Sequence, residues 1–132
     1  MVIVATSVWF DYFAGVSNAE TGWLDVEMGK QRLGVTDLIL CEILQGTRGD
    51  REFRVLKGAM LKYEGFATRG REMAIAASEN YRLLRKQGRT PRKTIDCCIA
   101  TFCCGVWCAR DVVAARLLAV LFVSHFVRRS LL

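Results

Sequence analysis

Residues 1–13 read MVIVATSVWFDYF, in which an apolar run is followed by a small polar pair and then by an aromatic-rich segment. The β-branched run Val2-Ile3-Val4 predicts a short buried strand. The small polar pair Thr6-Ser7 follows, and an aromatic-rich amphipathic stretch then predicts a helix. A buried parallel strand places functional side chains at its carboxyl end, where the next helix begins. A carboxylate at that turn would suit a metal site, but the residue there is Ala5.

The next segments repeat the order of helix and strand. Residues 18–21 are typical of a helix entrance, and apolar residues continue as far as Gly29. Residues 32–35 predict a second short buried strand, and residues 38–45 predict the helix that follows it. Strand, helix, short strand and then several helices is the order of a small α/β sandwich with a parallel sheet.

Three further helices are predicted downstream. Apolar residues recur at steps of three and four over residues 50–63, and Gly65 is expected to end this helix. A second pattern runs over residues 72–86 and closes at Gly88, and a third helix starts at Thr94.

Length and composition predict one globular domain over residues 1–132. The chain is 52% apolar and 24% charged, which excludes a disordered chain or a coiled coil. Its 19 Lys and Arg against 13 Asp and Glu give a formal charge of +6, which favours a polyanion or an acidic partner. A basic surface without any ligand is an equally open interpretation.

Six cysteines are present, five of them between residues 97 and 108. A strand pattern rather than a signal peptide opens the sequence, which predicts a reducing cytoplasmic location instead of a disulfide framework. The cluster lacks the paired spacing and nearby histidines of a zinc site. On a helix, Cys97, Cys104 and Cys108 share one face, so we interpret them as small core residues, with a metal or redox role as the alternative.

Three acids stand out because each lies in an apolar segment: Asp11, Glu42 and Asp96. Buried carboxylates are costly unless they are paired or coordinated, so Glu42 and Asp96 suggest a shared divalent cation. Each acid also has a structural interpretation. Asp96 can cap its helix, Glu42 can pair with an arginine at the boundary of the core, and Asp11 favours the surface.

Three segments occur in order along the chain: VIVATSVWFDYF at residues 2–13, TDLILCEILQG at 36–46, and RKTIDCCIATF at 92–102. Together they resemble the first three motifs of PIN-domain ribonucleases, and specifically the VapC toxins of bacterial toxin–antitoxin pairs. The resemblance covers about residues 1 to 103. In that family the first motif reads V-D-T-S-[VA]-W, so Thr6, Ser7, Val8 and Trp9 match it.

The resemblance implies a PIN-like three-layer sandwich, with a central parallel sheet flanked by helices. It implies an endoribonuclease dependent on Mg²⁺ or Mn²⁺ that cleaves structured RNA of the transfer or ribosomal class. Glu42 matches the second acid and Asp96 the third, so both are expected to bind metal and act in catalysis. Thr6 and Ser7 are expected to position the substrate. A cognate VapB-type antitoxin and a homodimer or toxin–antitoxin hetero-oligomer are the implied partners.

Basic side chains are candidates for positioning the phosphate backbone of the RNA. They are Arg48, Arg51, Arg85, Lys86, Arg89, Arg92 and Lys93.

One departure from the family is Ala5, which occupies the position of its first metal-binding aspartate. A methyl group is no metal ligand, so we expect this chain to be nearly inactive on RNA. An engineered substitution and a natural one look identical in sequence. The alternative function is a non-catalytic PIN-fold protein that binds an antitoxin or RNA.

The other departure is an atypical tail over residues 104–132, where the family usually carries an acid-rich segment. Asp111 is the sole acid in it and the one candidate for a fourth metal-site carboxylate. A frameshift that replaced the usual C-terminus is one explanation. Residues 112–127 are nearly all apolar, but they are short for a membrane span and contain Arg116, so a buried helix or strand pair is predicted and no membrane.

Overall fold

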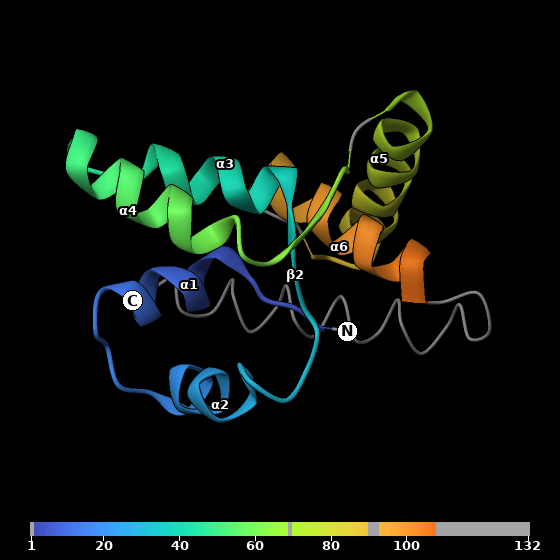
Figure 1. The fold of residues 1–132 in the computed structure, drawn as a ribbon. Coiled ribbons are helices and arrows are strands. Elements are labelled where there is room, and N and C mark those ends of the chain that lie inside the picture. The colour runs from blue at the N-terminus through green and yellow to red at the C-terminus, as the bar shows by residue number, and fades with distance from the viewer. Residues whose placement is uncertain (1, 69, 90–92, 108–132) are drawn as a thin grey trace. The chain divides into compact units, whose positions relative to one another are not determined.

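The computed structural model describes residues 2–68, 70–89 and 93–107 (Figure 1). The chain divides into two compact units, Met1–Ala67 and Thr68–Leu132. Within the described ranges, the first unit holds a three-stranded sheet and four helices, and the second holds two helices. The predicted tail residue Asp111 and the apolar stretch 112–127 lie outside the described residues.

The sheet consists of β1 (Val2–Ile3), β2 (Leu33–Thr36) and β3 (Glu64–Phe66), in the order β1-β2-β3. Both pairings are parallel, with Val2 opposite Leu33 and Gly34 opposite Glu64. Every residue of the central strand β2 is buried, as its apolar sequence predicts. The predicted α/β fold with a parallel sheet is therefore confirmed.

Four helices accompany the sheet in the first unit: α1 (Thr6–Phe13), α2 (Ala19–Glu27), α3 (Asp37–Gln45) and α4 (Asp50–Met60). Helix α1 packs against α2 and against α3, and α3 packs in turn against α4 (Figure 1). Each of these helices agrees with a predicted one to within three residues at either end.

Side-chain caps explain where two of these helices begin. The Asn18 side chain accepts a hydrogen bond from the Thr21 backbone N–H, and the Thr21 hydroxyl accepts one from the Asn18 backbone N–H, which is a capping box. The Thr36 hydroxyl oxygen likewise accepts from the backbone N–H of Ile39 at the start of α3.

Strand β3 corrects the prediction that Gly65 simply ends a helix. The helix ends at Met60, and Gly65 instead lies in the middle of β3, opposite Val35. Two of the three β3 residues are exposed, so no alternation of apolar and polar residues marks the strand. It is a strand because the buried edge of β2 provides backbone hydrogen-bond partners for it, which local sequence does not record.

The core of the first unit forms around a fully buried Trp9. Its ring stacks on Phe13 with centroids 5.8 Å apart and lies 5.0 Å from the Tyr63 ring. Leu24, Ile39, Ile43 and Met60 complete the set of largest buried apolar side chains. Each of the four helices of the first unit therefore contributes at least one side chain to this core.

The second unit contains α5 (Arg71–Lys86) and α6 (Thr94–Trp107), which pack against each other. The Asn80 side-chain amide donates a hydrogen bond to the Thr101 hydroxyl at 3.1 Å, and the Cys97 thiol donates one to the Ala77 carbonyl. Cys97 is buried, as predicted, and Cys104 is half-buried, whereas Cys108 lies outside the described residues.

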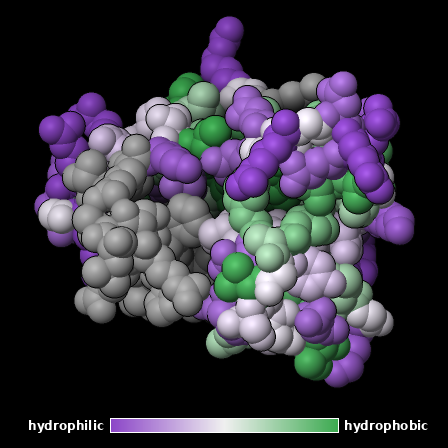
Figure 2. Space-filling view, turned by 90° about the vertical axis from the view of Figure 1, so that its left-hand side faces the viewer, coloured by the Kyte–Doolittle hydropathy of each residue, from purple (hydrophilic) through white to green (hydrophobic). Residues whose placement is uncertain are grey.

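None of the helices in the described ranges is long and apolar enough to cross a membrane. Exposed apolar residues (green) lie between hydrophilic ones (purple) on the face of the molecule that Figure 2 draws. Trp23, Val26, Val55 and Leu61 are among the exposed apolar side chains of the first unit.

Candidate functional site

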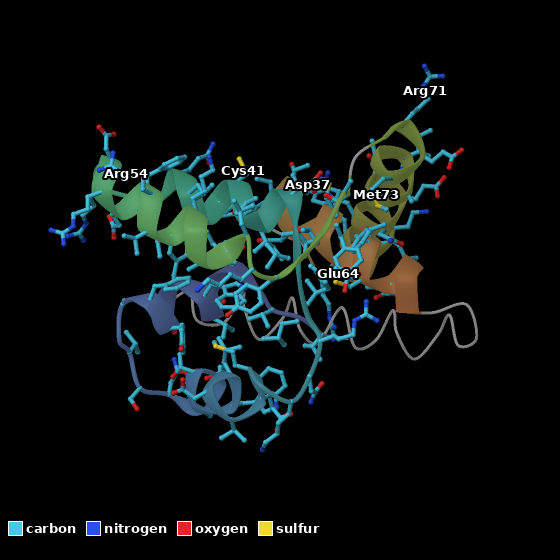
Figure 3. All side chains as sticks on the ribbon, in the orientation of Figure 1. Asp37, Cys41, Arg54, Glu64, Arg71 and Met73 are labelled. Carbon is cyan, nitrogen blue, oxygen red and sulfur yellow. The ribbon has the colours of Figure 1, made fainter. Side chains whose placement is uncertain are left out.

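Two helices of the first unit begin at the carboxyl edge of the parallel sheet. Strand β1 leads through Val4 and Ala5 into α1, and β2 passes directly into α3. Asp37, the first residue of α3, is exposed at that junction, and Figure 3 labels it there. Parallel strands bring such junctions to one edge of the sheet, which is where ligands bind in open α/β sheets.

A hydrogen bond joins the two helices at this edge. The Thr6 hydroxyl donates to Oε2 of Glu42, with the two oxygens 2.7 Å apart. Thr6 is the first residue of α1 and only 6% exposed, and Glu42 is half-buried in α3. The bond holds this carboxylate oxygen in place, because breaking the bond would leave the buried hydroxyl of Thr6 without a hydrogen-bond partner.

Ala5 stands at the N-cap of α1, directly before Thr6. Its backbone is extended, with φ −65° and ψ 151°, and no side-chain bond caps the helix. The Ala5 carbonyl accepts hydrogen bonds from the backbone N–H groups of Val8 and Trp9. An aspartate is preferred at such a position because its oxygen caps the helix. Ala5 also directly precedes Thr6, whose hydroxyl is bonded to Glu42.

The residues at this edge fit a hard divalent cation in part. Mg²⁺ and Mn²⁺ take oxygen ligands, and Glu42 supplies a carboxylate whose Oε2 is oriented by Thr6. The methyl group of Ala5 supplies no ligand atom. Over the described ranges, no group of three or more His, Cys, Asp or Glu side chains is arranged to hold a metal ion.

Asp96, the other predicted metal ligand, belongs to the second unit. It is the third residue of α6, lies in the first turn of that helix, and is half-buried. A carboxylate in the first turn interacts favourably with the partial positive charge of the helix N-terminus. Because α6 begins at Thr94, Asp96 lies inside the helix rather than at its N-cap.

Asp11 and Ser7 are the remaining candidates from the three motifs within the described residues of the first unit. Asp11 accepts a 2.8 Å hydrogen bond from the Asn18 side-chain amide, so it links α1 to the capped start of α2. Ser7 is half-buried beside Thr6. The structure thus brings Thr6 and Glu42 together, with Ala5 adjacent in the chain.

Two thiols of α6, those of Cys97 and Cys103, have a raised pKa that favours their neutral form. Burial, together with the neighbouring Cys104, raises the pKa of the Cys103 thiol to about 11. Burial also raises the pKa of the Cys97 thiol. A thiol whose pKa is raised is a poor nucleophile and a poor metal ligand at neutral pH. For Cys97, this agrees with the interpretation as a packing residue.

The sequence patterns do not reveal the aromatic cluster around Trp9. Burial raises the pKa of Tyr63, and burial together with Asp25 raises that of Tyr12. The indole Nε1 of Trp9 is buried without a hydrogen-bond partner within the part of the chain that the structure describes. The one sequence signal for it is Trp9 itself, which lies two positions after Ser7 in the first motif.

Comparison with protein-family models and with curated proteins finds no match for this chain.

Proposed function

We propose that this chain is the toxin component of a toxin–antitoxin pair, a Mg²⁺- or Mn²⁺-dependent endoribonuclease with a PIN-like three-layer fold, impaired by Ala5. The observation that carries the proposal is the hydrogen bond from Thr6 to Glu42 at the carboxyl edge of the sheet. It joins a residue of the first motif to the acid of the second, which lies 36 positions later. Residues from two of the three motifs are therefore in direct contact.

The proposed chemistry is metal-assisted cleavage of a phosphodiester. When bound, the cation would polarise the phosphate and lower the pKa of the attacking water. Glu42 and Asp96 are assigned as its ligands. Because the hydrogen bond from Thr6 already restricts the Glu42 side chain, Glu42 loses less conformational entropy when it binds the cation. Ser7, exposed in part beside Thr6, is assigned to positioning the RNA.

Ala5 is the reason for the proposed impairment. An aspartate there would add a second carboxylate to the edge that already holds Glu42. Loss of about 3 to 5 kcal/mol of transition-state stabilisation lowers a rate by roughly two to four powers of ten. The chain as it stands is therefore expected to cleave RNA very slowly.

The test is a Mg²⁺-dependent cleavage assay on bulk transfer RNA and ribosomal RNA with the parent chain, Ala5→Asp and Ala5→Asn. Ala5→Asn is the matched control, because asparagine caps α1 as well as aspartate does but carries no charge. We expect cleavage from Ala5→Asp alone, and its loss on adding EDTA or Glu42→Gln. Equal activity of the parent and Ala5→Asp would overturn the impairment, and no activity in any form would overturn the ribonuclease.

The second candidate is a non-catalytic PIN-fold protein that binds an antitoxin or RNA, and Ala5 is the observation that favours it. Calorimetry with Mn²⁺ separates the two functions. Tight binding by Ala5→Asp but not by the parent supports the ribonuclease. Absence of Mn²⁺ binding in both forms supports the binding protein.

The proposal includes a cognate VapB-type antitoxin and assembly as a homodimer or a toxin–antitoxin hetero-oligomer in the cytoplasm. These partners rest on the resemblance of the motifs. Co-expression with the frame adjacent to this gene, followed by co-purification, tests them. A chain that purifies alone and monomeric beside that frame would contradict them.

A further inference from the structure

Charge is distributed very unequally between the two units. Residues 1–67 carry seven Lys and Arg against nine Asp and Glu, a formal charge of −2. Residues 68–132 carry twelve against four, a formal charge of +8. The basic character of the whole chain therefore comes from the second unit. A polyanion would be attracted to that unit and repelled by most of the first.

Within the second unit, the positive charge is concentrated at the end of α5. Six of the twelve residues 82–93 are Lys or Arg, and none is Asp or Glu. Arg82, Arg85, Lys86, Arg89 and Lys93 are exposed in the structure, and Arg92 lies outside the described residues. We call the first four, which lie on the last turns of α5 and in its C-terminal cap, the basic turn. None of the four forms an ion pair with a carboxylate of the described residues.

The backbone holds the basic turn in a defined conformation. Gly88 adopts φ +75°, the Gly88 N–H donates to the Arg85 carbonyl, and the Arg89 N–H donates to the Leu84 carbonyl. This pair of bonds is a Schellman motif, which fixes the chain for two residues past the helix. Arg89 is thereby held against the helix end that already carries Arg85 and Lys86.

Stabilisation of the helix is the simplest alternative explanation for cations at this end. Lys and Arg in the last turn interact favourably with the negative end of the helix dipole. That effect accounts for Arg85 and Lys86, since it fades beyond the first and last turns. It does not account for Arg82, one turn earlier, nor for the absence of any acid over residues 82–93.

A second basic stretch, on α4, provides a contrast. Arg48, Arg51, Arg54 and Lys57 are all exposed, and Arg54 projects outward from α4 in Figure 3. Acids interrupt this stretch at Asp50 and Glu52. It also belongs to the unit whose formal charge is negative. At physiological salt, charges within about 8 Å dominate the local field, so these acids weaken the attraction for a polyanion.

We propose that the basic turn of α5, formed by Arg82, Arg85, Lys86 and Arg89, is the surface that binds the phosphate backbone of RNA. The identification of the polyanion as RNA rests on the proposed function. Three of the four side chains are arginines, whose planar guanidinium groups bind phosphate through two hydrogen bonds at once. Only seven peptide units separate Arg89 from Asp96, so their Cα atoms lie within about 25 Å of each other.

The test is binding of fluorescein-labelled bulk transfer RNA to the full chain, measured by anisotropy over a series of KCl concentrations in EDTA. EDTA removes the metal, so binding is measured without cleavage. The variant replaces the four residues of the basic turn by glutamine. The matched control replaces four exposed cations of the first unit, Lys30, Arg54, Lys57 and Lys62, by glutamine, which changes the net charge by the same amount.

We expect the basic-turn variant to bind at least about tenfold more weakly near physiological salt, and the slope of log K against log[salt] to fall by about 0.7 to 0.9 for each phosphate contact removed. The control variant should keep most of the parent's affinity and slope. Equal losses in the two variants would show that net charge alone matters and would overturn the proposal. So would parent-like binding by the basic-turn variant.

Two further measurements keep the outcome clear. If the fourfold variant unfolds, as judged by circular dichroism, the pair Arg85→Gln and Arg89→Gln is compared with the pair Arg54→Gln and Lys57→Gln. Binding of the parent to vesicles that contain phosphatidylserine, without binding to RNA, would overturn the assignment of RNA. If Ala5→Asp cleaves RNA equally well with and without the basic turn, the RNA-binding role of this surface is overturned, but the ribonuclease function stands. If the basic turn binds RNA but Ala5→Asp does not cleave it, the ribonuclease function is overturned, but this binding surface stands.

Discussion

The hydroxyl of Thr6 lies 2.7 Å from Oε2 of Glu42 and donates a hydrogen bond to it. The bond connects the first residue of α1 to the middle of α3, and both helices start at the carboxyl edge of the sheet. It therefore orients the carboxylate and contributes to the packing of the two helices. A change at Thr6 should affect both properties, and the two can be measured separately.

Thr6→Val removes the hydroxyl and keeps the shape of the side chain. We expect the free energy of unfolding to fall by about 1 to 3 kcal/mol, because the Glu42 carboxylate loses a hydrogen bond that is not replaced in a half-buried site. Urea denaturation measures this loss. Thr6→Ser is the control and should restore most of the stability, because it restores the hydroxyl. Parent-like stability of Thr6→Val with a loss confined to Thr6→Ser would instead assign the effect to packing of the methyl group.

Substitutions at Ala5 should separate helix capping from metal binding. Ala5 caps α1 without a side-chain bond, so Ala5→Asn is expected to raise the free energy of unfolding by about 0.5 to 2 kcal/mol. Ala5→Asp should raise it less in EDTA, because its charge repels Glu42, and more once Mg²⁺ is added. Thermal unfolding of both variants with and without Mg²⁺ tests this. A Mg²⁺ response as large in Ala5→Asn as in Ala5→Asp would count against a carboxylate ligand at this position.

Gly34 lies at a close approach within the sheet. A Cβ atom at this position would lie 2.7 Å from Ile3 Cδ1 and 2.7 Å from Phe66 Cε2, which is shorter than van der Waals contact. Gly34→Ala is therefore expected to destabilise the protein by about 1 to 3 kcal/mol. Gly58→Ala is the control. It lies in α4 with no atom near its Cβ, so it should stabilise by about 0.5 to 1 kcal/mol. Urea denaturation of the pair should show effects of opposite sign.

Alkaline pH should reveal the buried thiol of α6. The pKa of Cys103 is about 11 in the folded protein and 9.0 when unperturbed, so the unfolded chain loses this proton first. Stability from this group is complete below pH 9 and decreases as pH rises from 9 towards 11. The decrease is at most about 3 kcal/mol, because a shift of one pKa unit corresponds to about 1.4 kcal/mol. Cys103→Ala should flatten this part of the pH profile, and an unchanged profile would contradict the shift.

The sequence predicts the elements that have strong local signals. Asn18 and Thr36 precede their helices because their side chains bond to the first backbone N–H groups, and these bonds depend only on neighbours in the chain. Gly88 ends α5 for a similarly local reason, because its positive φ allows hydrogen bonds to the last carbonyl groups of the helix. Strand β3 could not be predicted this way, because Glu64–Phe66 becomes a strand only by pairing with β2, about 30 residues away.

The candidate site divides in a similar manner. Glu42 is identifiable in sequence as an acid within an apolar helix, and its half-burial agrees with that. Its hydrogen-bond partner Thr6 is not identifiable by periodicity, since Thr6 lies 36 residues earlier and on another helix. The bond between Asp11 and Asn18 is likewise not identifiable in the sequence, because it depends on how the chain turns between α1 and α2.

The parallel sheet has a consequence for how the chain folds during its synthesis. Strand β2 is the central strand, and each of its pairings joins residues about 30 positions apart, with a helical crossover between them. Such long loops close more slowly than local helical contacts form. A nascent chain that has emerged only as far as α4 therefore exposes one edge of its most buried strand. That edge is covered only when Phe66 leaves the ribosome.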